Sequence, residues 1–311
     1  MKYLKIVFIG IGCLLGIVIL ILLINCIRLN IQYQINKKNY TKTFSVVGSK
    51  KGYVPQGMAY DETHNIVLQT SYNTKDKPSS IYIINFKTGK LLKELLLKET
   101  DNSDNHLHVG GVATDGKTIW ITSDYQVNEY SLEEALKTKN NYLKSKKHSK
   151  LPIRGDFCYC KDNNLWIGDF YLKPFYPVPD DNPLLMKYNL DILDYNNPML
   201  IISLPKMVQG MAITDNDEFV FTRSFTYLVN SKLSTYKNIS DKKPEMYKLN
   251  NREVAYYHFD ETNLIKEETI PPMAEGIFYK DKSLYILFES DSDHYALAFP
   301  KIKSVLKKST N

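Results

Sequence analysis

The chain carries the stretch Gln56-Gly57-Met58-Ala59-Tyr60-Asp61 and repeats its pattern four more times. Each copy places a polar or small residue before a short apolar run, and a polar turn then leads to a second apolar segment. The copies begin at residues 57, 111, 157, 210 and 276, so the steps between them are 54, 46, 53 and 66 residues. The other four copies are His108-Val109-Gly110-Gly111-Val112-Ala113-Thr114-Asp115, Gly155-Asp156-Phe157-Cys158-Tyr159, Gln209-Gly210-Met211-Ala212-Ile213-Thr214 and Glu275-Gly276-Ile277-Phe278-Tyr279.

Each copy is followed, nine or ten residues after its glycine or glycine equivalent, by a second apolar strand. These strands cover residues 66–70, 119–122, 165–168, 219–222 and 284–287. A repeat of roughly 40–50 residues with about four strands per unit is typical of a β-propeller blade. The sequence therefore predicts an all-β protein with a five-bladed β-propeller over residues 43–306, and six blades is the alternative count.

One predicted strand, Thr43-Phe44-Ser45-Val46-Val47, comes before the first blade begins. Propellers often close their ring by adding a strand from one terminus to the blade built from the other, which removes open sheet edges. The last blade needs such a strand, because only residues 301–306 remain after its segment 295–299. We expect residues 43–47 to complete the blade that begins at Glu275.

Local propensity and the repeat disagree at residues 91–97, whose Leu-rich sequence favours a helix. The repeat places the outer strand of the first blade there, and we expect the repeat to prevail. Residues 133–136 of the second blade are expected to form one helical turn. Four prolines exclude regular structure from residues 174–183 of the third blade, so a long loop is predicted. The fourth blade is expected to contain a polar excursion at 238–251 and a strand at 253–259.

The composition is that of a globular protein with one large core, since 43% of the 311 residues are hydrophobic and 24% are charged. The net charge of +6 is modest. One dense basic run, formed by Lys144, Lys146, Lys147 and Lys150, has no interleaved aromatic residues. We interpret this run as a solvated loop and predict no nucleic-acid partner.

The N-terminal segment differs from the rest of the chain, because Ile6 to Ile27 contains 22 residues without a charge. About 20 such residues span a bilayer as a helix. A secretory signal has a shorter apolar core and a cleavage site of small residues, and neither precedes Arg28. The sequence therefore predicts contact with the membrane through residues 6–27. The expected organisation is a transmembrane signal anchor at 1–28, a linker at 29–42, the propeller at 43–306 and a tail at 307–311.

The orientation of this anchor rests on two opposing arguments. Lys2 and Lys5 precede the apolar run, whereas Arg28 and three lysines up to residue 42 follow it, so the positive-inside rule alone favours a cytoplasmic propeller. A short N-terminal anchor ahead of a large domain, however, most often delivers that domain across the membrane. We expect a single-pass protein of the cell membrane with an extracytoplasmic propeller.

Propeller geometry brings the start of each innermost strand and the end of each second strand to the same mouth of the channel. The starts form an inner ring of Gln56, His108, Asp156, Gln209 and Glu275. The ends form an outer ring of Ser71, Tyr72, Asn73, Ser123, Asp124, Asp169, Phe170, Arg223, Ser224, Glu289 and Ser290. Convergent polar groups over an apolar scaffold are the usual form of a small-molecule site.

The mouth is therefore the predicted binding site for a small polar ligand or a metal ion. We expect Glu275, His108 and Asp156 at its centre, where two acids and an imidazole would perturb one another's pKa values. The competing interpretation is that these side chains only satisfy buried amides at strand ends. The candidate ligand-binding residues are Gln56, His108, Asp156, Gln209, Glu275, Asp124, Asp169, Arg223 and Glu289.

The repeated x-Gly-apolar-Ala pattern, followed by a turn and an apolar strand ending in Ser or Asp, resembles the bacterial extracytoplasmic propellers of the broad NHL, lactonase and strictosidine-synthase-like kind. The resemblance covers about residues 43–306. Lactonase-type members usually have six blades and hold calcium with Glu, Asn and Asp side chains, so it implies Glu275 and Asp156 as candidate calcium ligands. This chain departs from that pattern, because Gln replaces Asn and five repeats are present.

Two further function classes remain open. The chain also resembles five-bladed glycoside hydrolases of the arabinanase and invertase kind, in which two carboxylates at a defined separation carry the reaction. The carboxylates that could supply such a pair here are Asp156, Glu275, Asp124, Asp169 and Glu289. Gln56 stands where those enzymes place an acid, and no Gly-x-Ser-x-Gly elbow occurs. Catalytic residues therefore stay unassigned. The third class is a protein-interaction platform that binds a cell-surface component through the Pro-rich and Lys-rich loops.

Overall fold

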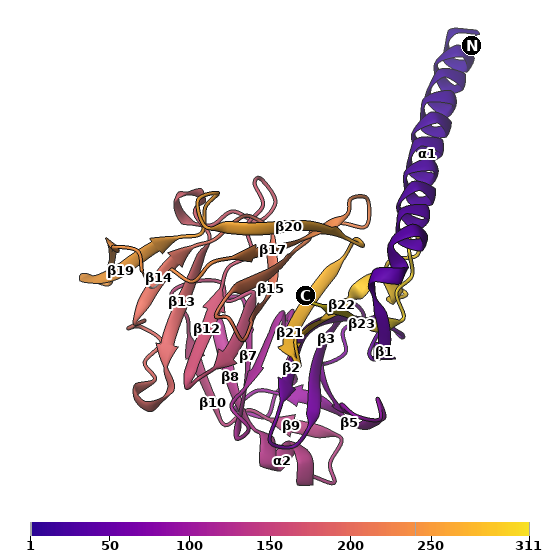
Figure 1. Ribbon diagram of the computed structural model, residues 1–311. Helices are drawn as coiled ribbons and strands as arrows, with labels where there is room; N and C mark the ends of the chain where they lie inside the picture. The colour runs from indigo at the N-terminus through magenta and orange to yellow at the C-terminus, as the bar shows by residue number, and fades with distance from the viewer. Residues whose placement is uncertain (1, 240, 311) are drawn as a thin grey trace.

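The computed structural model describes residues 2–239 and 241–310, which form five β-sheets around a central axis (Figure 1). Each sheet contains one copy of the sequence repeat, and the copy forms the innermost strand. The prediction of five blades is thereby confirmed, and the six-bladed alternative is excluded.

Blades one and two follow the same plan, with antiparallel strands running from the axis outward. Leu91–Lys98 is a strand as the repeat requires, and α2 (Leu132–Lys137) is the expected short helix. Blade one consists of β2 (Tyr53–Asp61), β3 (Ile66–Asn73), β4 (Ser80–Asn85) and β5 (Leu91–Lys98), with β9 (Tyr142–Lys144) added in parallel at the edge. Blade two consists of β6 (Gly111–Thr114), β7 (Thr118–Ser123), β8 (Gln126–Ser131) and β10 (Lys147–Lys150).

We expect the Lys-rich run to be a solvated loop. In the structure most of it instead belongs to strands β9 and β10. Leu143, in the middle of β9, is fully buried in the core between blades one and two. Lys144 ends β9, and Lys147 and Lys150 are the exposed first and last residues of β10. The lysines therefore cover the outer edges of two blades and keep those edges charged.

Blade three is the largest sheet and contains a segment that the sequence analysis assigned to blade four. The hairpin of β18 and β19 joins it through a parallel pairing of β19 with β14. The edge of β14 would otherwise expose unpaired backbone groups, and β19 covers it. Its strands are β11 (Phe157–Lys161), β12 (Asn164–Gly168), β13 (Leu184–Asn189), β14 (Leu200–Ser203), β19 (Arg252–His258) and β18 (Glu245–Leu249).

Blade five closes the ring as expected, because β1 pairs antiparallel with β23 at the edge of the last sheet. The strand covers Thr41–Ser45, two residues earlier than predicted, and β23 extends to Ser309, into the segment that we expect to be the tail. Blade four consists of β15 (Val208–Ile213), β16 (Phe219–Arg223), β17 (Ser231–Tyr236) and β20 (Leu264–Ile270). Blade five consists of β21 (Ala274–Lys280), β22 (Ser283–Phe288), β23 (Ser304–Ser309) and β1 (Thr41–Ser45). Short 3₁₀ turns are η1 (Lys37–Asn39), η2 (Pro179–Asp181), η3 (Leu190–Ile192) and η4 (Glu289–Asp291).

The repeated glycine allows the innermost strands to pack against one another around the axis. A Cβ on Gly57 would lie 2.8 Å from the carbonyl oxygen of Gly110, and one on Gly276 would lie 2.5 Å from the amide nitrogen of Met58. Both distances are too short for a real side chain. Blade three reverses the arrangement, since Phe157 replaces the inner glycine and Gly168 stands opposite it on the second strand.

Contacts between neighbouring blades hold the ring together. The Thr70 hydroxyl donates a hydrogen bond to the backbone carbonyl oxygen of Val109 at 2.8 Å. The Thr222 hydroxyl donates in the same way to the backbone carbonyl oxygen of Glu275 at 2.6 Å. The buried apolar side chains of the described residues form five clusters, and each cluster lies between two adjacent blades. The core is therefore a ring of interfaces, and it includes the interface closed by β1.

The N-terminal helix α1 runs without a break from Lys2 to Asn36 and stands out from one side of the propeller (Figure 1). It contains a stretch long and apolar enough to cross a membrane. The segment 29–42, which we expect to link the anchor and the propeller, consists of the end of α1, the 3₁₀ turn η1 and the start of β1. Leu29 is almost completely buried against the propeller, which extends the helix past Arg28.

Candidate functional site

A cavity of about 320 Å³ opens at the mouth where the innermost strands begin. Its walls combine carboxyl groups, amides, one guanidinium and several aromatic rings. The lining residues are Gln56, Tyr72, His108, Asp124, Arg154, Asp156, Phe170, Tyr176, Gln209, Phe225, Glu275, Glu289 and Tyr295.

A second, wider cavity of about 710 Å³ lies at the opposite mouth, where the innermost strands end. It is lined mainly by the polar hairpin turns, such as Asp115, Asp162 and Asp281. Between the two mouths the channel holds only about 10 Å³, because the repeat glycines bring the strands together. The first cavity is the better candidate, since its carboxyl groups Glu275 and Glu289 are buried, whereas most carboxylates of the second cavity are exposed in hairpin turns.

The buried carboxyl pair Glu275 and Glu289 forms one side of this cavity. Glu275 begins the innermost strand of blade five, and Glu289 follows the second strand, so antiparallel pairing places them side by side. The amide of Gln209 donates to Glu275 at 3.2 Å, and that of Gln56 donates to Glu289 at 3.0 Å. Tyr295 donates its hydroxyl proton to Glu289 at 3.2 Å.

Both carboxyl groups have a raised pKa. Burial raises the pKa of Glu275 well above its usual value, and the neighbouring charge of Glu289 adds to the effect. Burial likewise raises the pKa of Glu289, against the lowering influence of Tyr295 and Gln56. No Lys, Arg or His in the described ranges 2–239 and 241–310 forms an ion pair with either group. The pair therefore retains a proton more readily than free glutamate.

A second polar group, on blade three, surrounds Arg154. Its guanidinium lies 3.2 Å from a carboxylate oxygen of Asp156 and 3.9 Å from one of Asp124. Asp156 also accepts the backbone N–H of Phe170 at 2.7 Å. Burial nevertheless raises the pKa of Asp156 to about 6, because desolvation exceeds the stabilising effect of Arg154. Among the residues that the structure describes, the buried Nε atom of Arg154 has no hydrogen-bond partner.

His108 contributes its ring to the cavity from an exposed position at the mouth. Desolvation of the ring lowers the pKa of His108 to about 4, with Arg154 adding to the decrease and Asp124 opposing it. The ring stacks on Tyr72 with centroids 4.4 Å apart and an angle of 27°. At neutral pH this imidazole is therefore uncharged, and it offers one donor and one acceptor.

An aromatic wall, formed by Phe170, Tyr176 and Phe225, closes the cavity toward the outer rim. Phe170 and Phe225 are stacked at 6.5 Å, and Tyr176 meets Phe225 edge-on at 6.3 Å. The Arg154 guanidinium lies 5.5 Å from the centre of the Tyr176 ring. Tyr176 comes from the Pro-rich insertion, so that long loop contributes directly to the site.

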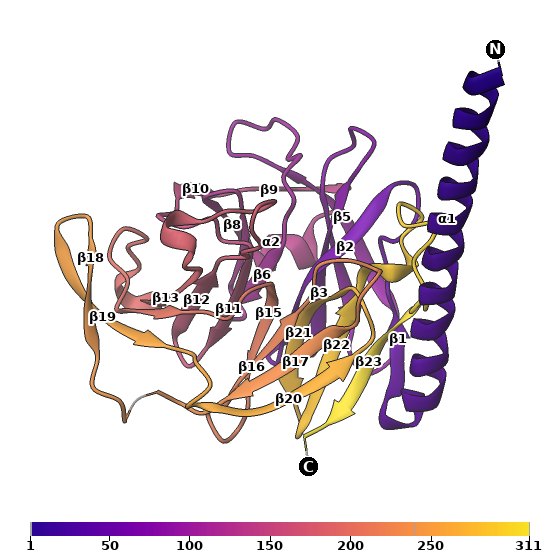
Figure 2. The ribbon, with the colours of Figure 1, turned by 90° about the horizontal axis from the view of Figure 1, so that it is seen from above.

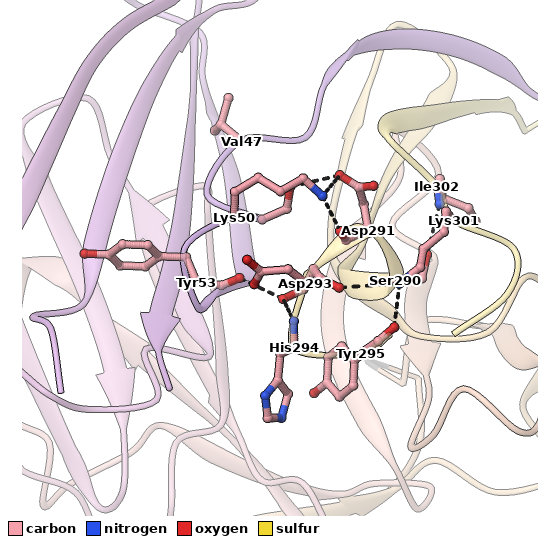
Figure 3. A network of polar contacts seen from close by, with 12 residues as sticks. Val47, Lys50, Tyr53, Ser290, Asp291, Asp293, His294, Tyr295, Lys301 and Ile302 are labelled. Atoms are coloured by element: carbon pink, nitrogen blue, oxygen red, sulfur yellow. Dashed lines mark hydrogen bonds and ion pairs between the residues drawn. The ribbon is translucent and has the colours of Figure 1, made fainter. Parts of the chain in front are cut away.

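A hydrogen-bond network holds the segment that carries Glu289 and Tyr295 (Figure 3). Lys50 forms an ion pair with Asp291 at 3.1 Å and donates to its carbonyl oxygen at 2.8 Å. Ser292 donates to the carbonyl oxygen of Tyr53 at 2.8 Å, at the start of the innermost strand of blade one. The segment is therefore fixed between blades five and one, which orients the carboxyl pair.

Seven of the nine predicted site residues line the cavity: Gln56, His108, Asp124, Asp156, Gln209, Glu275 and Glu289. Asp169 lies behind it, where it accepts the backbone N–H of Arg154 at 2.7 Å, and burial raises the pKa of Asp169 to about 7. Arg223 does not face the cavity. It is the last residue of β16, and its side chain turns along the blade to pair with Glu267 at 2.8 Å.

Sequence reasoning missed four lining residues: Arg154, Tyr176, Phe225 and Tyr295. Arg154 precedes Asp156 by two residues, and Phe225 follows the predicted outer ring by one, so a wider window around each ring position would have included both. Tyr176 and Tyr295 lie inside loops whose paths the repeat does not specify. Their contribution appears only in the folded chain.

A metal centre is not formed by the described residues, in which no three His, Cys, Asp or Glu side chains are arranged to hold an ion. Glu275 is engaged by Gln209, whereas Asp156 is engaged by Arg154. The two candidate calcium ligands thus belong to different polar groups, and each already has a partner within the chain.

Comparison with known proteins supports the fold. No protein-family model matches the chain, and no curated protein matches its sequence. Among solved structures, glutaminyl cyclase from Myxococcus xanthus is similar with a TM-score of 0.50 and 7% identity, covering 88% of this chain and 97% of that chain. A PQQ-bound aldose sugar dehydrogenase from Streptomyces coelicolor has a TM-score of 0.49 and 11% identity, covering 86% and 96% of the two chains. The similarity to the first of these structures agrees with the five-bladed β-propeller behind one N-terminal apolar helix that the strand topology shows.

Proposed function

We propose that this protein is a single-pass, membrane-anchored, extracytoplasmic β-propeller that binds a small organic cation in the channel-mouth cavity. The ligand class is a molecule with an ammonium or guanidinium group and a short apolar part. The observation that carries this proposal is the carboxyl pair Glu275 and Glu289, which is buried and forms no ion pair with a cation in the described part of the chain.

The charge of the cavity supports a cationic ligand. Four carboxyl groups, those of Asp124, Asp156, Glu275 and Glu289, line it against one guanidinium. Arg154 already pairs with Asp156, which leaves the glutamates on the other side without a counter-ion. A bound cation would replace the retained proton and would supply the missing charge where water is largely excluded.

The aromatic wall supports an organic ligand over a bare ion. Ring faces attract cations through their quadrupole, by about 0.5–2 kcal/mol for each well-placed contact. Phe170, Tyr176 and Phe225 would contact the apolar part of the ligand while the glutamates take its charged group. A cavity of about 320 Å³ suits a small molecule. Glu275 and Asp156 belong to two different polar groups. This argues against the role of calcium ligands that the lactonase-like resemblance implies for them.

The anchor component of the proposal rests on helix α1. Its apolar stretch is long enough to cross a membrane, and the side chains within that stretch are exposed rather than buried in the protein. We also propose that the propeller lies on the extracytoplasmic side, because a short N-terminal anchor precedes a large domain in the chain.

Acid-base catalysis is a second candidate, favoured by one specific observation. The pKa of both Glu275 and Glu289 is raised by burial, so one of them can hold a proton at neutral pH while a neighbour accepts one. This is the requirement for a hydrolase that uses a carboxylic acid with a carboxylate.

The test is ligand-induced stabilisation of the purified full chain in detergent. Thermal unfolding is followed with choline, ethanolamine, agmatine and neutral alcohols of similar size, and with calcium, EDTA, lactones and oligosaccharides. A cation present at 100 times its dissociation constant should add about 2.7 kcal/mol to the free energy of unfolding. Glu275→Gln, which keeps the shape and removes the charge, should abolish the effect.

The matched control is Glu62→Gln, because Glu62 is an exposed carboxylate at the opposite mouth. It should retain the full shift. Stabilisation by cations that survives in Glu275→Gln would refute the proposed site. A response to calcium alone would favour the metal alternative, and turnover of a lactone or oligosaccharide would favour the hydrolase.

A further inference from the structure

Helix α1 docks onto the two loops that also supply walls of the cavity. The Asn25 amide donates to the carbonyl oxygen of Leu228 at 2.7 Å. The Cys26 thiol lies 3.5 Å from the carbonyl oxygen of Leu297. The 224–230 loop contributes Phe225 to the cavity, and the 292–300 loop contributes Tyr295. The helix and the cavity therefore share the same face of the propeller, which we call the mouth face.

The contact lies at the end of the apolar run. Asn25 and Cys26 belong to the last turn of the uncharged segment that ends at Ile27. A run of this length matches the hydrocarbon core of a bilayer, about 30 Å thick, at a rise of 1.5 Å per residue. The two loops consequently lie where the hydrocarbon core gives way to the headgroup layer.

Exposed apolar side chains gather on the loops of this face. Val229 is 52% exposed, Leu297 is 57% exposed, and Phe299 is 44% exposed. Phe175, at the tip of the Pro-rich insertion, is 68% exposed and stacks on Phe225 with ring centres 5.9 Å apart. Large apolar side chains concentrated on one face of a protein mark an interaction surface.

The helix continues this surface beyond Arg28. Ile27, Ile31 and Ile35 follow one another at intervals of four residues and are all exposed. The other side of the helix carries Leu29 and Tyr33, which pack on the propeller. Figure 2 shows α1 beside the β1 edge of blade five, with its other side free. These isoleucines therefore lie on the side of the helix that the propeller does not cover.

We propose that the mouth face of the propeller rests on the bilayer, so that the cavity opens onto the lipid headgroup layer. The partner is the membrane that holds α1, and the inference rests on the anchor component of the proposed function. Val229, Leu297 and Phe299 enter the interfacial layer, and a ligand reaches Glu275 and Glu289 from the membrane surface.

The experiment measures lipid contact in the full chain, reconstituted into phosphatidylcholine vesicles with brominated acyl chains. Tryptophan is introduced singly by Leu297→Trp, Val229→Trp, Ile192→Trp and Ile17→Trp. Trp120 and Trp166 are buried within the blades and give a constant background. We expect strong quenching for Ile17→Trp, partial quenching for Leu297→Trp and Val229→Trp, and none for Ile192→Trp.

Ile192 is the matched control, because it is 77% exposed on η3, between two strands of blade three. Quenching at residue 17 without quenching at residues 229 and 297 would overturn the membrane-resting face and leave the anchor intact. If Ile17→Trp were not quenched, helix α1 would not lie in the bilayer. Both the membrane anchor and the membrane-resting face would then be refuted. Equal quenching at residue 192 would show non-specific adsorption and would also overturn the proposed orientation.

Discussion

Glu289 couples the stability of the ligand-free protein to pH. Burial raises its pKa to about 8, whereas the unfolded chain loses this proton near the ordinary value of 4.5. Between those values the folded state binds more protons than the unfolded state, so the free energy of unfolding falls as pH rises. We predict that the contribution of Glu289 to this free energy decreases from about pH 4.5 to about pH 8, with a slope that approaches about 1.4 kcal/mol per pH unit between these values.

Glu289→Gln should flatten this dependence, as measured by chemical denaturation of the full chain in detergent at several pH values. His108, whose pKa is lowered to about 4 in the fold from 6.5 in the unfolded chain, adds an opposite slope below about pH 7 in both proteins, and this contribution cancels in their difference. Burial raises the pKa of Asp169 to about 7, and this residue titrates in both proteins. Its contribution to the pH dependence therefore cancels when the two are compared. If the free energy of unfolding changed with pH equally in the two proteins, Glu289 would be ionised in the folded state and the prediction would be wrong.

Strand β1 is the element on which closure of the ring depends. It lies at the outer edge of blade five, yet Phe44 is buried among residues of blades five and one, including Tyr285 and Ile84. Phe44→Ala would leave a cavity at the closing interface. We predict a loss of about 3–5 kcal/mol in the free energy of unfolding.

Lys42→Ala is the matched control for this strand, because Lys42 is exposed and its backbone pairs with Leu306 whatever its side chain. Its free energy of unfolding should stay within about 0.5 kcal/mol of the original. A small effect of Phe44→Ala, equal to that of the control, would mean that blade five is stable without β1.

At the scale of the whole molecule, the helix determines where the propeller works. We predict that the full chain remains with membranes after an alkaline carbonate wash. Protease added to intact cells should cleave the propeller, and the turn around Ile192, which lies away from the mouth face and is 77% exposed, is a suitable site.

Two outcomes would contradict this arrangement. Protection of the propeller until the cells are lysed would place it in the cytoplasm, as the positive charges after the apolar run favour. Recovery of a soluble form that begins after residue 28 would identify the segment as a cleaved signal. Fractionation of a tagged full chain distinguishes the three cases.

The sequence by itself determined the number of blades, the closing strand and most of the inner ring. The repeat fixes which residues begin each innermost strand, and five strands around one axis bring equivalent residues together, so Gln56, His108, Asp156, Gln209 and Glu275 all line one cavity. The glycine of the repeat could be recognised for the same reason, because it stands where neighbouring strands leave no space for a Cβ.

Only the tertiary structure decided the rest of the site. Tyr176 and Tyr295 reach the cavity along loops with no repeat, and Arg223 turns away because its side chain finds Glu267 on the outer strand of its own blade. The 245–258 hairpin joined blade three because an open strand edge lay nearby in space. Helix α1 continues past Arg28 beside blade five, where Leu29 is buried and Tyr33 packs against the core between blades four and five. Each outcome depends on contacts between segments far apart in the chain, which local pattern and spacing do not specify.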